Sequence, residues 1–146
     1  MDDEPGRLAI RALAVLVFIL ASSSSFADTS ERFGKGGWYK DFQPEIERAN
    51  SSGELFRIKG HCQSLCTLFL GLRNVRVERS ASLLFHAGHD RQRNINAGST
   101  QRMLNAYNPK LRKYLIDNHY METLAFHTIP GGKIIDAFGY RECPRQ

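Results

Sequence analysis

The sequence predicts an α/β fold with a mainly parallel sheet and flanking helices. Short runs of β-favouring residues alternate along the chain with longer segments of helical periodicity, and no internal repeat is visible. This alternation is typical of strand, helix, strand connections that place neighbouring strands in parallel. Residues 28–146 suffice for one compact domain and leave no room for two.

Residues 1–27 carry the features of a secretory signal peptide. Arg7 and Arg11 precede an apolar run over 12–21, and residues 25–27 (SFA) form the small-x-small pattern at which signal peptidase cuts. As a helix the apolar run rises only about 15 Å, roughly half of a hydrocarbon core, so cleavage is favoured over an uncleaved anchor. We therefore expect a periplasmic or secreted protein that meets a membrane only through an uncleaved signal.

The first half of the processed chain contains a helix, a strand and a buried helix. Residues 28–37 are polar and glycine-rich, which predicts a loose lead-in. Helical spacing predicts a helix over 38–50, and alternation predicts a strand over 55–59. The segment 64–72 is apolar on every side and is expected to be a buried helix, for which Ser64 is a good N-terminal cap.

The second half continues the alternation. Val- and Leu-rich runs predict strands over 74–78 and 81–86, and a polar, mobile loop is expected over 87–97. Downstream, the pattern predicts a helix that resumes at Ser99, breaks at Asn108-Pro109 and continues to about His119. A last helical turn is expected over 121–126 and a break over 129–132. Residues 134–138 are expected to form a closing helix or strand.

Three cysteines, Cys62, Cys66 and Cys143, lie in the exported part. An oxidising compartment predicts one disulfide and one spare thiol, and the sequence leaves the pairing open. A bond from Cys143 to either of the other two is the preferred interpretation, because it would close a long loop and constrain the unfolded chain.

A few residues could together carry acyl-transfer chemistry. Ser64 stands where a strand ends and an apolar helix begins, and unpaired N–H groups at a helix N-terminus favour the negative charge that grows during attack. His86 ends a later strand and could serve as its base, although a lone histidine at a strand end is usually structural. Gly36 and Gly37 offer backbone N–H groups for an oxyanion, and Leu65 follows the serine.

These residues resemble the periplasmic branch of the Clp-protease-like family in the crotonase-type superfamily. The resemblance covers residues 36–140, and its strongest parts are 60–67 (GHCQSLCT) and 83–86 (LLFH). It implies a spiral of ββα units, often oligomeric, here truncated at the N-terminus. It also implies the site roles: Ser64 as nucleophile, His86 as base, and Gly36 and Gly37 as the oxyanion hole. We expect the N–H of Leu65 to act with the N–H of Gly37 on the oxyanion.

The chain departs from the family in two ways. The position of the acidic triad member falls on His127, where no carboxylate stands, although Asp136 is near in sequence. An acid normally orients the histidine, so its absence puts activity in doubt. Strands that usually precede the paired glycines are missing, and an exposed sheet edge would call for a second copy or a partner protein. The sequence thus leaves two functions open: a peptide or acyl hydrolase, or a catalytically inactive binding or assembly module.

Zinc binding and polyanion binding are two further alternatives, and no cofactor is expected. Zinc could use a histidine and cysteine cluster, but the spacing is loose and oxidation would compete for the thiols. A basic stretch and the formal net charge of +5 favour anionic partners, yet nucleic acid is not expected for an exported chain. The cluster is His61, Cys62, Cys66, His86 and His89, and the basic stretch is Arg91, Arg93, Arg102, Lys110, Arg112 and Lys113.

Overall fold

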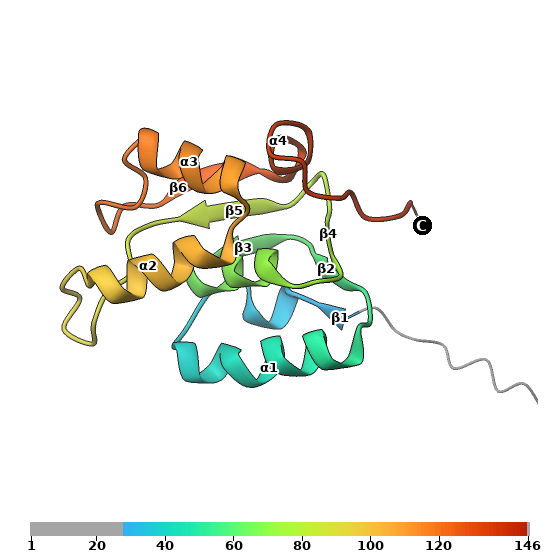
Figure 1. Cartoon of the computed structure of the whole chain (residues 1–146), viewed down its shortest axis with the longest axis horizontal. Coiled ribbons are helices and arrows are strands. Elements are labelled where there is room, and N and C mark those ends of the chain that lie inside the picture. The colour runs from blue at the N-terminus through green and yellow to red at the C-terminus, as the bar shows by residue number, and fades with distance from the viewer. Residues whose placement is uncertain (1–27, 146) are drawn as a thin grey trace, which may run out of the picture.

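The computed structural model describes residues 28–145, so the predicted signal peptide lies outside the described residues (Figure 1). Within them the chain forms a mixed α/β structure with two three-stranded sheets. The first sheet has the order β1 (Asp28–Thr29), β2 (Phe56–Ile58), β4 (Val75–Val77), and the second has the order β3 (His61–Gln63), β5 (Ser82–Phe85), β6 (His127–Pro130).

Helices lie on both sides of these sheets. In Figure 1, α1 lies at one end of the molecule, whereas α3 and α4 lie at the opposite end beside β6. Between residues 28 and 145 no helix has the length and apolar character to cross a membrane. The helices are η1 (Glu31–Phe33), α1 (Tyr39–Ser52), η2 (Ser64–Gly71), α2 (Ala97–Ala106), α3 (Pro109–Asp117) and α4 (Gly131–Asp136), of which η1 and η2 are 3₁₀ helices.

The α/β class is confirmed, but the strands divide between two small sheets instead of forming one. Strands β2 and β3 enter different sheets before η2, and β4 and β5 do the same before α2. Gly60, with φ 63°, turns the chain between β2 and β3, a conformation that glycine adopts without strain. The pairs β1–β2, β2–β4 and β3–β5 are parallel, and β5–β6 is antiparallel.

Aromatic side chains fill the space between α1, the first sheet and η2. The ring of Phe69, on η2, lies 4.4 Å from Phe56, 5.6 Å from Phe42 and 5.1 Å from Phe33, measured between centroids. Phe42, Phe56 and Phe69 are all fully buried. The predicted buried helix is therefore confirmed in position, and it supplies the centre of the core on which the N-terminal segments rest.

The prediction of a loose lead-in over 28–37 is wrong. Residues Asp28–Thr29 pair with β2, and Ser30 is fully buried. The Ser30 hydroxyl donates to the Lys59 carbonyl (3.2 Å), and the same oxygen accepts from the Lys59 N–H (3.1 Å). These bonds join residues far apart in the sequence, so local composition does not reveal them.

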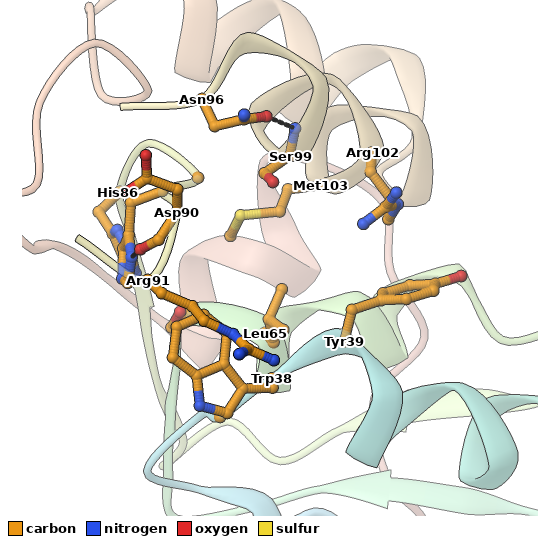
Figure 2. Close-up of a pocket in the computed structure, with 14 residues that line it drawn as sticks. Trp38, Tyr39, Leu65, His86, Asp90, Arg91, Asn96, Ser99, Arg102 and Met103 are labelled. Carbon is orange, nitrogen blue, oxygen red and sulfur yellow. Dashed lines mark hydrogen bonds between the residues drawn. The ribbon is translucent and has the colours of Figure 1, made fainter. Parts of the chain in front are cut away.

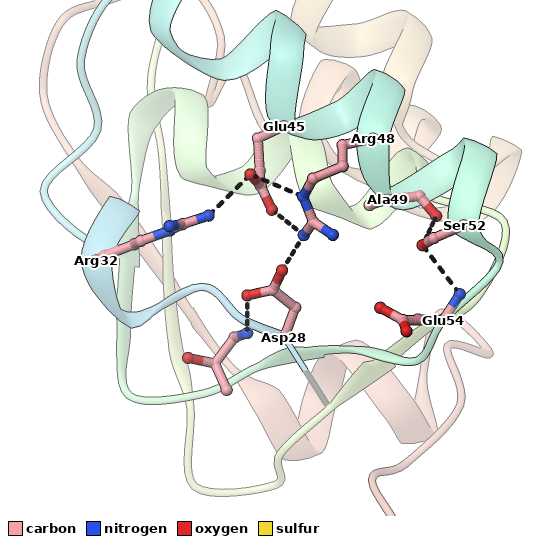
Figure 3. A network of polar contacts seen from close by, with 8 residues as sticks. Asp28, Arg32, Glu45, Arg48, Ala49, Ser52 and Glu54 are labelled. Carbon is pink, nitrogen blue, oxygen red and sulfur yellow. Dashed lines mark hydrogen bonds and ion pairs between the residues drawn. The ribbon is translucent and has the colours of Figure 1, made fainter. Parts of the chain in front are cut away.

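A carboxylate on α1 ties the same N-terminal segment to the helix (Figure 3). Glu45 is buried, with 8% of its surface exposed, and accepts a hydrogen bond from Arg32 (2.8 Å) and others from Arg48. Arg48 also binds Asp28 of β1. The network fixes the start of the described chain against α1.

The C-terminal third also differs from expectation. Residues 121–126 are not helical, and the segment predicted as a break forms β6, whose Ile129 is buried. The closing helix begins at Gly131, where an added Cβ would lie 2.1 Å from the Glu78 carbonyl oxygen. Gly131 therefore permits close chain approach where a break was expected. Past α4, residues 141–143 run beside β4, through a parallel bridge between Val77 and Glu142.

The loop over 87–97 is anchored, in contrast to the mobile loop predicted. A bridge pairs His89 with Ile95, and the Asp90 carboxylate accepts from the Asn94 N–H (2.8 Å). The Asn96 side chain caps α2 by accepting from the Ser99 N–H (2.8 Å). The loop is thus held at both ends, next to His86, which follows β5.

Candidate functional site

Ser64 occupies a backbone conformation that side chains rarely adopt. Its φ is 55°, it opens η2 directly after β3, and Gln63 takes the capping position without a side-chain cap bond. Within residues 28–145 the Ser64 hydroxyl makes no hydrogen bond, so the expected role as a helix cap is wrong. The left-handed conformation costs a non-glycine residue about 1 kcal/mol, and such strain clusters at functional sites.

A disulfide between Cys62 and Cys66 brackets this serine, with a Cα–Cα distance of 5.2 Å. Cys143 is a buried free thiol, so the preferred pairing of Cys143 is wrong. Its N–H binds the Val77 carbonyl in the first sheet, whereas Cys62 belongs to the second. The bond also removes the two thiols from the zinc alternative, and no metal-binding cluster occurs in the part of the chain that the structure describes.

Two buried hydroxyl groups, linked by a hydrogen bond, fix the backbone at Ser64. The Thr67 hydroxyl donates to the Ser64 carbonyl (2.7 Å). Because this spends the one proton of Thr67, the Tyr107 hydroxyl is the donor in its 2.6 Å bond to Thr67. Burial raises the pKa of Tyr107 far above its usual value, which keeps the hydroxyl protonated as a donor.

The glycine-rich segment 34–37 packs directly against this junction. Gly36 has φ 73°, and an added Cβ would lie 2.9 Å from the Ser64 Cβ. Gln63 ties the segment down, because its N–H donates to the Gly34 carbonyl (2.9 Å) and its side chain donates to the Lys35 carbonyl (2.9 Å). The sequence therefore places glycine where backbone must touch the serine.

Two of the three expected oxyanion donors remain available. The Gly36 N–H donates to the Phe33 carbonyl (2.9 Å), so Gly36 serves packing and not anion binding. The Gly37 N–H has no hydrogen-bond partner among residues 28–145. Leu65 lies in the first turn of η2, where N–H groups lack partners within the helix. Gly37 and Leu65 both line the cavity described next.

Ser64 and His86 line the same two adjoining cavities, whose volumes are about 310 and 340 Å³. Figure 2 shows the first, with His86 and the 90–91 segment on one side and α2 on the other. The two residues therefore line the same cavities, although no hydrogen bond joins them directly. Proton transfer between them requires a side-chain rotation or a bridging water.

His86 is a buried, uncharged base. Only 4% of its surface is exposed, and its ring packs edge-on against Phe126 (5.0 Å) and stacks with His89 (5.9 Å). Burial lowers the pKa of His86 below its usual value of 6.5, and the nearby charge of Arg93 acts in the same direction. The imidazole is therefore neutral at pH 7 and able to accept a proton.

Neither candidate for the third member of a triad reaches His86. Its Nδ1 is buried and lacks a hydrogen-bond partner among the described residues. His127 stacks on Tyr120 with ring centroids 4.1 Å apart, and Asp136 lies on the surface in a bidentate ion pair with Arg79. An acidic hydrogen-bond partner for the His86 imidazole is thus missing from residues 28–145.

Sequence reasoning missed the aromatic residues at the cavity mouth. Trp38 lines both cavities and is 45% exposed, and Phe126 lines the second and is 48% exposed. Their signal in the sequence was weak, because Trp38 reads as the start of a helix and Phe126 as part of a helical turn. Exposed large aromatics beside a cavity are typical of ligand-binding surfaces.

The predicted basic stretch divides between two places. Arg91, Arg93 and Arg102 line the cavities, whereas Arg112 donates to backbone carbonyls and Lys113 pairs with Asp117 on α3. The first three therefore belong to the site.

Comparison with protein-family models, with curated proteins and with solved structures gives no match for this chain.

Proposed function

We propose that this protein is an exported serine hydrolase that resembles the Clp-protease-like family, with peptide or acyl substrates. The observation that carries the proposal is the meeting of Ser64 and His86 in the wall of the same cavities, although 22 positions separate them in the sequence. The Cys62–Cys66 disulfide supports an oxidising compartment outside the cytoplasm.

The mechanism follows from the residues at hand. The Ser64 hydroxyl attacks the acyl carbonyl while the neutral His86 imidazole takes its proton. The N–H groups of Gly37 and Leu65 stabilise the oxyanion, and His86 then returns the proton to the leaving group. Water, activated by the same histidine, hydrolyses the acyl-enzyme and regenerates the serine.

Several features of the backbone support a nucleophile at Ser64. Its φ is positive, its hydroxyl makes no hydrogen bond and a disulfide surrounds it, as expected for a hydroxyl that is positioned for reaction. The order of two strands followed by a helix, which occurs twice, resembles the ββα units of the crotonase-type superfamily. A spiral of such units is part of this proposal, as is assembly with a second copy or a partner protein at a remaining sheet edge.

One observation favours a second function, a catalytically inactive binding or assembly module. The buried Nδ1 of His86 lacks an acidic partner in the described residues. Without such a partner the charged imidazole is poorly stabilised, and hydrolysis slows greatly or stops. The same cavities would then bind a ligand without cleaving it.

A fluorophosphonate probe, which reacts with activated serines, separates these functions. The hydrolase predicts labelling of the folded wild-type protein and its loss in both Ser64→Ala and His86→Ala. Ser82→Ala is a matched control, because Ser82 is the first residue of β5 and lies outside the cavities. Folded wild-type protein that stays unlabelled, with folding verified by circular dichroism, would contradict the hydrolase and favour the module.

A further inference from the structure

The cavities lined by Ser64 have both apolar and cationic side chains in their walls. Leu65 and Met103 line the first cavity from η2 and α2, and Trp38 covers its edge. In Figure 2, Arg102 lies near Tyr39 on one side of the cavity, whereas the segment that carries Arg91 lies with His86 on the other. The guanidinium of Arg102 lies 4.3 Å from the centre of the Tyr39 ring. A bound peptide would therefore contact apolar side chains and positively charged side chains in the same cavity.

The second cavity extends the same charge. Lys35 and Arg93 line it, and no carboxylate is among its lining residues. The first cavity has one carboxylate, Asp90, which accepts hydrogen bonds from the N–H (2.8 Å) and the side-chain amide (3.1 Å) of Asn94. Four cations thus face one carboxylate whose oxygens are already engaged.

Among the described arginines outside the cavities, Arg32, Arg48, Arg57 and Arg79 form ion pairs, and the others form none. Arg79 forms ion pairs with Asp136 (2.7 Å) and Glu142 (3.0 Å), and Arg32 pairs with Glu45. Within residues 28–145 no ion pair involves Arg91 or Arg102, and both line the first cavity. Unpaired cations around an apolar cleft attract anionic ligands and raise their local concentration.

We propose that the site takes acidic peptides, in which a large apolar side chain lies beside the scissile acyl group and carboxylates flank it. The apolar side chain packs on Leu65, Met103 and Trp38, and the carboxylates bind Arg91 and Arg102 bidentately. This inference rests on the proposed function for cleavage, but the binding itself does not depend on it.

Trp38 allows binding to be measured without catalysis, because it is the one tryptophan of the chain and lies in both cavity walls. Its fluorescence is followed in the Ser64→Ala variant, which cannot form an acyl-enzyme. The probes are acetyl-Asp-Leu-Leu-Asp-amide, its neutral isostere acetyl-Asn-Leu-Leu-Asn-amide, and acetyl-Asp-Ala-Ala-Asp-amide. The acidic leucine peptide should bind about tenfold more tightly than either of the others, as expected for two solvent-exposed charge pairs or for the loss of one partly buried leucine side chain.

Charge-matched variants locate the effect. The double variant R91Q/R102Q should abolish the preference for the acidic peptide over its isostere, whereas K110Q/R141Q, which removes two exposed cations outside the cavities, should retain it. Equal affinities for all three peptides, or equal loss in both double variants, would overturn the proposal. Binding with the predicted preference in a protein that no fluorophosphonate labels would uphold this inference while the hydrolase fails.

Discussion

Substitution of Gly36 by alanine tests whether the glycine segment sets the position of Ser64. Gly36 has φ 73°, and an added Cβ would lie 2.9 Å from the Ser64 Cβ and 3.0 Å from the Gln63 carbonyl oxygen. Gly53, the C-cap of α1, has a similar φ of 68°, but nothing lies within 4 Å of an added Cβ. Gly53→Ala is therefore a control that carries the same backbone strain without the clash.

The structure sets the expected magnitudes. Alanine in the left-handed region costs about 1–2 kcal/mol in either variant. The clash adds about 1–3 kcal/mol in Gly36→Ala alone, which is typical of overpacking. Urea denaturation should therefore show a larger loss of unfolding free energy for Gly36→Ala than for Gly53→Ala. Fluorophosphonate labelling of the folded protein should fall about 10- to 100-fold in Gly36→Ala, because small displacements of a nucleophile are costly.

The comparison between the two variants decides the outcome. Labelling at the wild-type rate in Gly53→Ala would show that general destabilisation does not explain the loss. Equal stability losses in the two variants, together with unchanged labelling in Gly36→Ala, would refute the inferred contact between Gly36 and Ser64.

Three other predictions concern the base, the disulfide and the fold. Because burial lowers the pKa of His86, its imidazole stays neutral to a more acidic pH than a free histidine does. The labelling rate should therefore be at its plateau at pH 7 and fall only as the pH drops below 6.5. A half-maximal rate above pH 6.5 would be inconsistent with a buried base. The same lowered pKa means that the contribution of His86 to stability is present above 6.5 and is lost as pH falls through the folded-state value. Reduction of the Cys62–Cys66 bond should cost about 2 kcal/mol of stability and slow labelling, because the turn around the strained serine loosens; unchanged labelling in reductant would separate the bond from the site. Glu45→Gln should lower the free energy of unfolding, measured by chemical denaturation, by about 1–2 kcal/mol. This is towards the low end for a buried carboxylate, because the partners Arg32 and Arg48 are solvent-exposed. A loss no larger than that of an exposed ion pair would contradict the buried network.

Local pattern predicted the elements whose residues interact with near neighbours. The apolar run after Cys62 indicated a buried helix, and the strand that ends in His86 was predicted nearly to its final residue. Ser64 follows β3 and His86 follows β5, two paired strands of the second sheet, so both residues line the same cavities.

Features that depend on distant partners escaped prediction. Ser30 is buried through bonds to Lys59, and β6 is short and has a proline at its end. Burial of Cys143 beside Val77 prevents the long-range disulfide that loop entropy favoured. The mouth of the cavity likewise assembles from Trp38, the 87–97 loop and Phe126, and their proximity is a property of tertiary packing.

If Ser64 is an activated nucleophile, peptide mapping of the fluorophosphonate adduct will identify it. Mass spectrometry of the natively labelled protein should place the adduct on Ser64, and protein unfolded in urea before labelling should carry none. An adduct on a different hydroxyl, or equal modification of native and unfolded protein, would contradict the claim.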